Sequence, residues 1–180
     1  NAIYSVSVAA LRAAAAADKK ELCNYLAGGP ITQVPVPSFN VINGGRYATL
    51  TQPFNEFIIM PYRAASIYEA VEMSVLTFQK LEEAIYQYSH KKPAVAGSYG
   101  YAAPSVNPET LLDLMSEAID VCGYTGKFAF ALDCASGEMY DKKTNTYLLK
   151  GKRVSSDELI GYAKGLTEKY NFVFIEDLLD

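Results

Sequence analysis

The alternation of apolar and helical segments after residue 107 constrains the fold of this chain most strongly. Residues 127–133 and 172–176 form apolar runs of strand length, each typical of a strand that is covered on both faces. The segment 155–170 between them has apolar residues at helical spacing. Strand, helix and strand in this order indicate two parallel strands joined by a right-handed crossover. The sequence therefore predicts an α/β protein.

The first half of the chain predicts further strands beside these two. Residues 1–27 are interpreted as one helix, which the Gly-Gly-Pro sequence at 28–30 ends. Strands are predicted at 34–42 and 54–60, and the glycine pair at 44–45 predicts a turn where the backbone comes close to another group. Four strands cannot close a barrel, so partner strands are expected from a longer polypeptide or from another chain.

Three helices are expected to cover the sheet. One follows the second strand, one begins after Asn107, a good capping residue, and one begins at the capping-box sequence 155–158. The segment 94–106 is interpreted as a loop, and 137–151 as an exposed hairpin or loop. The residues expected to face the core are Ile67, Val71, Ser74, Phe78, Leu81, Ile85 and Tyr88, then Leu111, Met115, Ala118 and Cys122, then Ile160, Ala163, Leu166 and Tyr170.

Composition narrows the classes of function. The net charge of −4 speaks against binding to nucleic acid or to an anionic membrane, and no apolar run has the length of a membrane span. Three dispersed cysteines without a CxxC spacing favour reduced thiols in an intracellular protein over a zinc site. The single histidine, His90, excludes a multi-histidine metal site within this chain.

Asp133 and Glu176 are the best candidates for chemistry, because each ends a predicted parallel strand. In a βα barrel this places both carboxylates on the C-terminal rim, where active sites are built. Carboxylate oxygens at such a rim suit Mg²⁺. Acids at strand ends are also common as solvated groups or loop caps, and spacing alone favours that plainer interpretation.

Several stretches resemble the enolase family. The sequences at 36–45 and 55–61 match the first two barrel strands of enolases, while Leu132-Asp-Cys-Ala-Ser136 and Ile175-Glu-Asp177 match two metal-binding segments. The resemblance runs over essentially the whole chain. It implies that Asp133 and Glu176 bind the catalytic Mg²⁺ and that Glu56 lines the substrate site.

The resemblance also implies an architecture, a partial enolase-type TIM-like barrel that begins with an antiparallel strand pair. Residues 1–30 would lead into the barrel as a helical segment, and residues 31–180 would form its first half, with four strands. The family's N-terminal domain and the rest of the barrel would lie outside this chain.

The chain departs from the family at two positions that matter for chemistry. After Asn43-Gly-Gly45 enolases have Ser-His-Ala-Gly, and here Tyr47 replaces the histidine. In the next loop enolases have Gly-Asp-Glu-Gly-Gly, and here Tyr99 replaces the general-acid glutamate in Gly97-Ser-Tyr-Gly-Tyr101. Losing a general acid typically lowers the rate about 10²–10⁴-fold.

Three functions therefore compete. The preferred one is a pseudoenzyme that serves as a scaffold in a larger assembly or oligomer, and the 14 tyrosines suit a contact surface. The second is a Mg²⁺-dependent phosphopyruvate hydratase, the glycolytic lyase that converts 2-phosphoglycerate to phosphoenolpyruvate. The third is a related Mg²⁺ enzyme with altered acid and base groups. A cytoplasmic location is expected, with cytoskeletal association as an option, and neither nucleic acid nor membrane is an expected partner.

Overall fold

The computed structural model describes residues 1–45 and 54–180 and divides into two compact units, Asn1–Pro35 and Val36–Asp180. The first unit contains helices α1 (Ala2–Ala17) and α2 (Leu22–Ala27). The single helix expected over 1–27 is therefore wrong in one respect, since Lys19 adopts a left-handed φ of 54° between them. The helix breaks where Asp18 begins a charged stretch, and Asp competes with the helix by bonding to nearby backbone.

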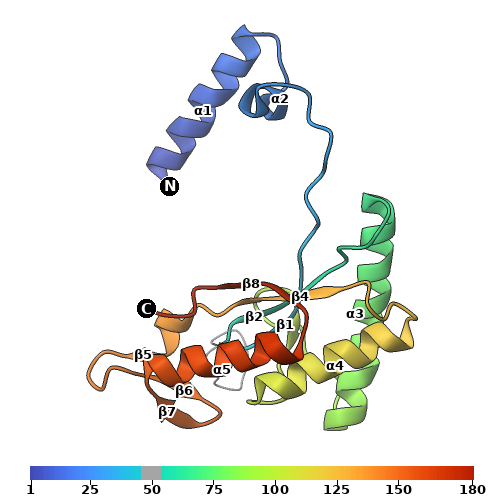
Figure 1. Cartoon of the computed structure of the whole chain (residues 1–180), viewed down its shortest axis with the longest axis vertical. Helices are drawn as coiled ribbons and strands as arrows, with labels where there is room; N and C mark the ends of the chain where they lie inside the picture. Colours follow the sequence, from blue (N-terminus) through green and yellow to red (C-terminus); the bar gives the residue numbers. More distant parts are fainter. Residues whose placement is uncertain (46–53) are drawn as a thin grey trace. The chain divides into compact units, whose positions relative to one another are not determined.

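The second unit is built on a five-stranded sheet with the order β3-β1-β2-β4-β8. The strands β1 and β2 are antiparallel, as are β2 and β4, whereas β4 and β8 are parallel. The predicted antiparallel start and the parallel pair are both confirmed, and this partial barrel is not closed (Figure 1). The bounds are β1 Phe39–Asn43, β2 Glu56–Met60, β3 Tyr101–Ala102, β4 Ala129–Asp133 and β8 Phe172–Glu176.

Three sequence-based expectations about these strands are wrong. The first strand begins at Phe39, not at residue 34, because the prolines at 35 and 37 cannot donate ladder hydrogen bonds. The segment interpreted as a loop contains β3, which pairs in parallel with β1. The last strand was expected to be buried on both faces, yet β8 lies at the sheet edge and Val173 is 55% exposed.

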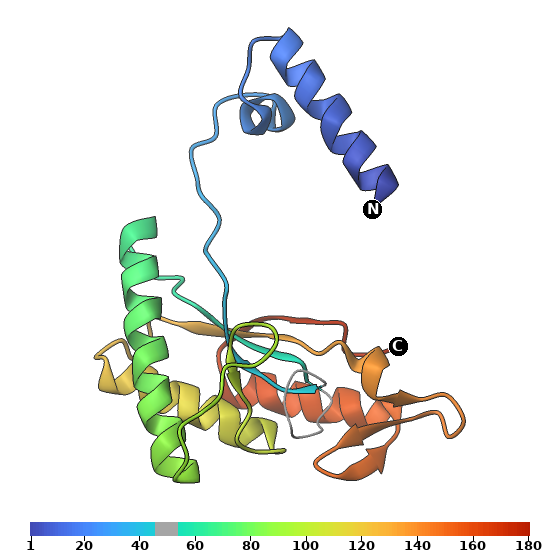
Figure 2. The ribbon, with the colours of Figure 1, turned by 180° about the vertical axis from the view of Figure 1, so that it is seen from behind.

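Helices α3 (Ile67–Ser89), α4 (Pro108–Val121) and α5 (Ser156–Lys169) complete the second unit. Figures 1 and 2 show α4 and α5 along the same side of the sheet, with α3 packed against α4. The predicted caps are present: Asn107 Oδ1 accepts the Glu109 N–H at 3.3 Å, and Ser155 and Glu158 form a reciprocal capping box. Helices α4 and α5 therefore begin where the sequence predicts.

The buried faces of two helices differ from the expected ones. On α3, Ile67, Val71 and Tyr88 are 42%, 43% and 50% exposed. On α5, Ile160 is 43% exposed and its neighbour Leu159 is fully buried. On α3 the expected stripe followed large apolar residues, but the helix buries a face that includes several small side chains. That face consists of Ala70, Met73, Ser74, Thr77, Leu81, Ala84 and Ile85.

The segment 137–151 forms most of a second, three-stranded antiparallel sheet. A short 3₁₀ helix, η2 (Ser136–Met139), precedes its strands β5 (Tyr140–Asp141), β6 (Thr146–Leu149) and β7 (Lys152–Val154). The expected hairpin is thus present, although β6 is not exposed throughout, since Tyr147 and Leu149 join the core. Among the residues that the structure describes, no helix is long and apolar enough to span a membrane.

Candidate functional site

Three carboxylates from neighbouring strands lie side by side where the strands end on one side of the main sheet. Glu56 begins β2, Asp133 ends β4 and Glu176 ends β8. In the strand register Glu56 pairs with Asp133, and Asp133 pairs with Glu176. Because β2 runs antiparallel to β4, its first residue lies beside the last residues of β4 and β8. We call Glu56, Asp133 and Glu176 the carboxylate row.

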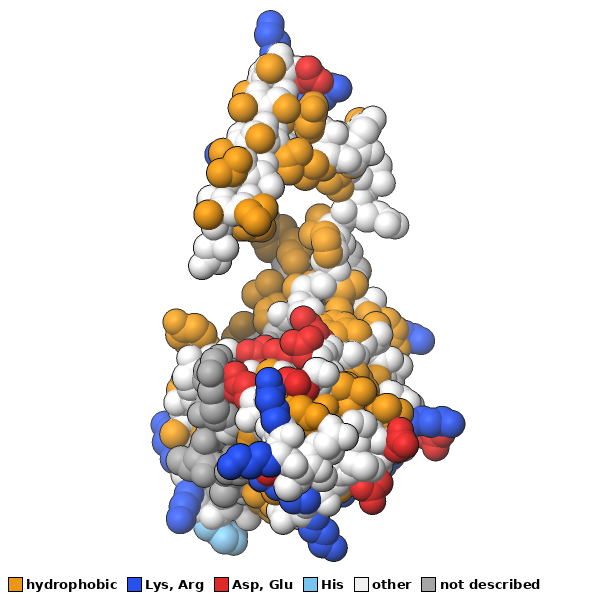
Figure 3. Space-filling model, turned by 90° about the vertical axis from the view of Figure 1, so that its left-hand side faces the viewer, with side chains coloured by type: hydrophobic (Ala, Val, Ile, Leu, Met, Phe, Trp, Pro, Cys, Tyr) orange, Lys and Arg blue, Asp and Glu red, His pale blue; other side chains and the backbone are white. Residues whose placement is uncertain are grey.

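The electrostatics of the row favour a bound cation. Burial raises the pKa of the half-buried Asp133, and the charges of Glu176, Glu56 and Asp177 raise it further, against the hydrogen bond that its Oδ1 accepts from Ala135 N at 3.1 Å. The face of the second unit near the C-terminus carries a group of acidic side chains (Figure 3). A cation placed at Asp133 would relieve this repulsion.

The carboxylate oxygens of the row are suitable ligands for Mg²⁺, but the row offers few of them. Carboxylate oxygens are the ligands Mg²⁺ prefers, and it commonly binds through one or two protein carboxylates together with water and substrate phosphate. Within residues 1–45 and 54–180, no three His, Cys, Asp or Glu side chains converge closely enough to hold a metal ion. Asp133 and Glu176 would therefore hold it as a pair.

A loop contact orients Glu56, and sequence reasoning missed it. Ser98 Oγ donates to Glu56 Oε1 at 2.7 Å, and Asn40 Nδ2 donates to the Ser98 carbonyl at 3.1 Å. Gly100 N donates to Asn43 Oδ1 at 2.9 Å, and a Cβ on Gly100 would lie 2.6 Å from that oxygen. Only glycine allows this approach, so the loop is held against β1. The available signal was the serine that stands where enolases have aspartate.

Tyr99, in the same loop, does not belong to the row. Its side chain is 86% exposed and its φ is 71°, an unusual conformation for a residue other than glycine. It lines a small pocket between β1 and α3, and none of the three carboxylates lines that pocket. The other departure, Tyr47, lies outside the described residues.

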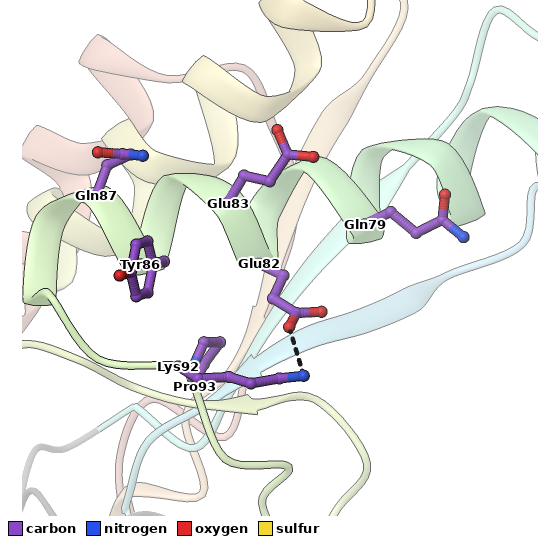
Figure 4. A pocket seen from close by; sticks show the side chains of 7 residues that line it. All are labelled: Gln79, Glu82, Glu83, Tyr86, Gln87, Lys92 and Pro93. Atoms are coloured by element: carbon purple, nitrogen blue, oxygen red, sulfur yellow. Dashed lines mark ion pairs between the residues drawn. The ribbon is translucent and has the colours of Figure 1, made fainter.

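A larger pocket of about 630 Å³ also lies away from the row (Figure 4). It is formed by the surface of α3 and by Lys92 and Pro93. Its acids already have partners: Glu82 pairs with Lys92 at 3.3 Å, and Glu83 pairs with Lys80 at 2.8 Å. The pocket therefore has no unpaired acid for a ligand.

Cys134, beside Asp133, is not suited to act as a nucleophile. It is 1% exposed, and burial followed by the charges of Asp133, Asp177 and Glu176 raises the pKa of its thiol. A reactive cysteine needs the thiolate form, which this environment disfavours. The carboxylates are therefore better candidates for chemistry at this end of the strands than Cys134 is.

We expect Asp133→Asn to stabilise the protein at neutral pH. The folded-state pKa of Asp133 lies above its ordinary value of 3.8, so holding the charged form costs stability at pH values above both. Asparagine removes this cost and can still accept the Ala135 N–H. Urea unfolding at several pH values should show the advantage at pH 7 and its loss as the pH falls through the folded-state pKa towards about 4.

The exposed Glu117→Gln on α4 serves as a control and should change little at either pH. Equal stability of Asp133→Asn and the unaltered protein at pH 7 would contradict the unfavourable environment assigned to Asp133. The same samples should show that saturating Mg²⁺ stabilises the unaltered protein more than Asp133→Asn, since a ligand of the folded state shifts unfolding by mass action.

Comparison with known proteins agrees with this fold. Residues 31–180 match the family model described as "Enolase, C-terminal TIM barrel domain". The chain is 40% identical over 181 residues to the enolase of Methanococcus aeolicus, covering 100% of this chain and 43% of that protein. It is also 40% identical over 178 residues to the enolase of Methanocaldococcus jannaschii, covering 98% of this chain and 42% of that protein.

The partial barrel of the structure, together with these matches, defines the class of protein as an enolase-type α/β barrel. The chain belongs to the enolase family. It spans somewhat less than half of the length of the curated relatives it matches.

Proposed function

We propose that this chain is a catalytically impaired member of the enolase family that serves as an interaction part of a larger assembly. The observation that carries the proposal is the position of Tyr99. It replaces the family's general acid, and its side chain lies exposed beside α3 and outside the carboxylate row. The carboxylic acid that donates the proton in the family's reaction is therefore replaced in this loop by a phenol.

Dehydration of 2-phosphoglycerate requires two proton transfers. A base removes the proton from the α-carbon, and an acid protonates the departing hydroxide, which gives phosphoenolpyruvate and water. A phenol hydroxyl is a far weaker acid than a carboxylic acid and transfers its proton less readily. The Ser98 hydroxyl already donates to Glu56, so it is engaged in holding that side chain.

The carboxylate row has two roles in this proposal. Asp133 and Glu176 would hold Mg²⁺, and Glu56 would face the substrate from the next strand. Mg²⁺, when bound, would neutralise the row and stabilise the negative charge that develops on the substrate. Without a cation the row repels a phosphorylated acid, because the carboxylates and the substrate are all anionic.

Exposed tyrosines support the role in contacts. Tyr68 on α3 is 84% exposed, Tyr86 is 51% exposed and Tyr99 is 86% exposed. Tyrosine gives a large contact area at a small cost in side-chain entropy and is enriched at protein interfaces. A homo- or hetero-oligomer is the simplest assembly of this kind, and a cytoskeletal assembly in the cytoplasm is another form of the same proposal.

The test is an absorbance assay for phosphoenolpyruvate on the purified full-length protein with 2-phosphoglycerate and excess Mg²⁺. The Methanocaldococcus jannaschii enolase serves as the positive control. We expect turnover far below the ordinary enzymatic range of about 1–10³ s⁻¹. Light scattering after size exclusion should give a mass at least twice that of one full-length chain. Turnover within the ordinary range, or a monomer without partners, would overturn the proposal.

A working phosphopyruvate hydratase is the second candidate. The intact row of Glu56, Asp133 and Glu176 favours it, since these are the positions that the family uses for substrate and metal. The same assay separates the two candidates. Turnover in the ordinary range that Asp133→Asn lowers at least about tenfold would support the hydratase.

A further inference from the structure

Ser98 lies in the loop between α3 and β3, and its hydroxyl donates a hydrogen bond to Glu56 at 2.7 Å. We propose that Ser98 is a positioning residue, which holds the Glu56 carboxylate off the position that Asp133 and Glu176 share for Mg²⁺. This role rests on the proposed function in one respect, the assignment of Mg²⁺ to that pair. It gives a specific cause for the small number of ligands in the carboxylate row.

The strand register brings Glu56 within reach of the metal position. Glu56 lies directly opposite Asp133, and Asp133 lies opposite Glu176, so all three side chains leave the same face of the sheet. The Cβ atoms of directly opposite residues in antiparallel strands are about 4.5–5.5 Å apart, a spacing that lets two carboxylates share one cation. The backbone therefore allows three acids to serve as ligands.

The side chains do not converge as the backbone allows. Within residues 1–45 and 54–180, no three acids, histidines or cysteines lie close enough together to hold one metal ion. Glu56 has its Oε1 in the hydrogen bond with Ser98 instead. A hydroxyl that donates to a carboxylate forms one of the stronger hydrogen bonds of proteins, so Glu56 must give up a favourable contact before it can bind a cation.

The loop presents the Ser98 hydroxyl in a fixed position. Asn40 Nδ2 on β1 donates to the Ser98 carbonyl at 3.1 Å, and Gly100 N donates to Asn43 Oδ1 at 2.9 Å. Within the loop, Ala96 N donates to the Gly100 carbonyl at 2.8 Å. Contacts on both sides of Ser98 thus hold its backbone against β1, and little further entropy is lost when its hydroxyl forms the bond.

The residue type at position 98 decides this role. Enolases have Gly-Asp-Glu-Gly-Gly where this chain has Gly97-Ser-Tyr-Gly-Tyr101, so a serine replaces an aspartate. An ionised aspartate only accepts hydrogen bonds and would repel Glu56, whereas a serine hydroxyl donates to it. The serine therefore gives this chain a restraint on Glu56 that an ionised aspartate does not supply.

The test is titration calorimetry of the purified full-length protein with Mg²⁺. Ser98→Ala frees Glu56 and should lower the dissociation constant for Mg²⁺ about tenfold. Ser98→Thr keeps a hydroxyl at this position and should bind Mg²⁺ as the unaltered protein does. A merely structural role of Ser98 would not tighten binding, because a loosened loop weakens a site or leaves it unchanged.

Glu56→Gln identifies the group that causes the gain. Combined with Ser98→Ala it should abolish the tenfold gain, and on its own it should change the dissociation constant less than about threefold. Ser116→Ala is the matched control, since it removes another half-buried serine hydroxyl, which donates to the Leu112 carbonyl within α4 at 2.8 Å. It should leave Mg²⁺ binding unchanged.

The results distinguish a failure of the Ser98 restraint from a failure of the proposed metal pair. Mg²⁺ binding that Asp133→Asn weakens and that Ser98→Ala does not tighten would overturn the role of Ser98 and leave the pair intact. The absence of saturable binding in both the unaltered protein and Ser98→Ala would overturn the pair, and the role of Ser98 with it. A gain in Ser98→Ala that persists with Glu56→Gln would also contradict the proposal, because a group other than Glu56 would cause it.

Discussion

Turnover of 2-phosphoglycerate is expected to rise about a hundredfold when Tyr99→Glu is combined with Tyr47→His. A positioned general acid typically contributes about 10²–10⁴-fold to a rate, and the pair of substitutions restores the family's residues at both positions. We expect the low end of this range, because residue 99 lines the pocket beside α3 and must move towards the row to act. The phosphoenolpyruvate absorbance assay with excess Mg²⁺ measures the gain.

Because Tyr99 is exposed, its replacement should change activity without changing the stability of the fold. A side chain that is 86% exposed contributes little to folding, so its replacement should leave the unfolding transition nearly unchanged. Tyr99→Gln combined with Tyr47→His is the matched control, since glutamine has the size of glutamate but no acidic proton. Tyr68→Glu adds a carboxylate at another exposed position and should have no effect on turnover.

The outcomes distinguish a site that lacks only its general acid from a site that has lost other groups as well. A gain with glutamate and none with glutamine would show that the row still binds substrate and lacks only its acid. The absence of a gain in a folded protein that still responds to Mg²⁺ would contradict this explanation. The loss of activity would then extend beyond the two tyrosines.

The sequence could predict the strands of the row because their signals are local. Each parallel strand is an apolar run that ends in an acid, and the register then brings Asp133 and Glu176 together without further information. The contact of Ser98 with Glu56 could not be predicted in this way. It joins residues 42 positions apart, and nothing in the local pattern around either residue specifies it.

The apolar run at 172–176 also failed to predict how exposed β8 is. Its apolar residues predict coverage on both faces, yet Val173 and Phe174 are 55% and 38% exposed at the edge of the sheet. Apolar residues at an open edge are an aggregation liability that proteins normally cover or blunt. The apolar residues of β8 thus indicate that other residues should cover the strand, and the described residues do not cover it here.

The helical faces show a third kind of error. Periodicity identifies a helix reliably, but adjacent apolar residues leave its rotation open by about 100°. In α5, Leu159 and Ile160 are neighbours of similar size, and Ile160 was the residue expected in the core. The structure buries Leu159 completely and leaves Ile160 43% exposed. The two residues therefore offer a matched comparison within one helix.

Leu159→Ala is expected to cost about 2–5 kcal/mol of unfolding free energy, and Ile160→Ala less than about 1 kcal/mol. The large cost arises because a buried leucine loses its transfer free energy and leaves a cavity among the core residues that surround it. The exposed isoleucine leaves no cavity, and alanine has the higher helix propensity, which offsets part of the lost contact. Urea unfolding should show a lower midpoint for Leu159→Ala with an unchanged slope, so that the shift reports stability and not a change in the denatured state. A larger cost for Ile160→Ala would mean that α5 turns Ile160 and not Leu159 towards the core, and the packing of α5 on the sheet would have to be revised.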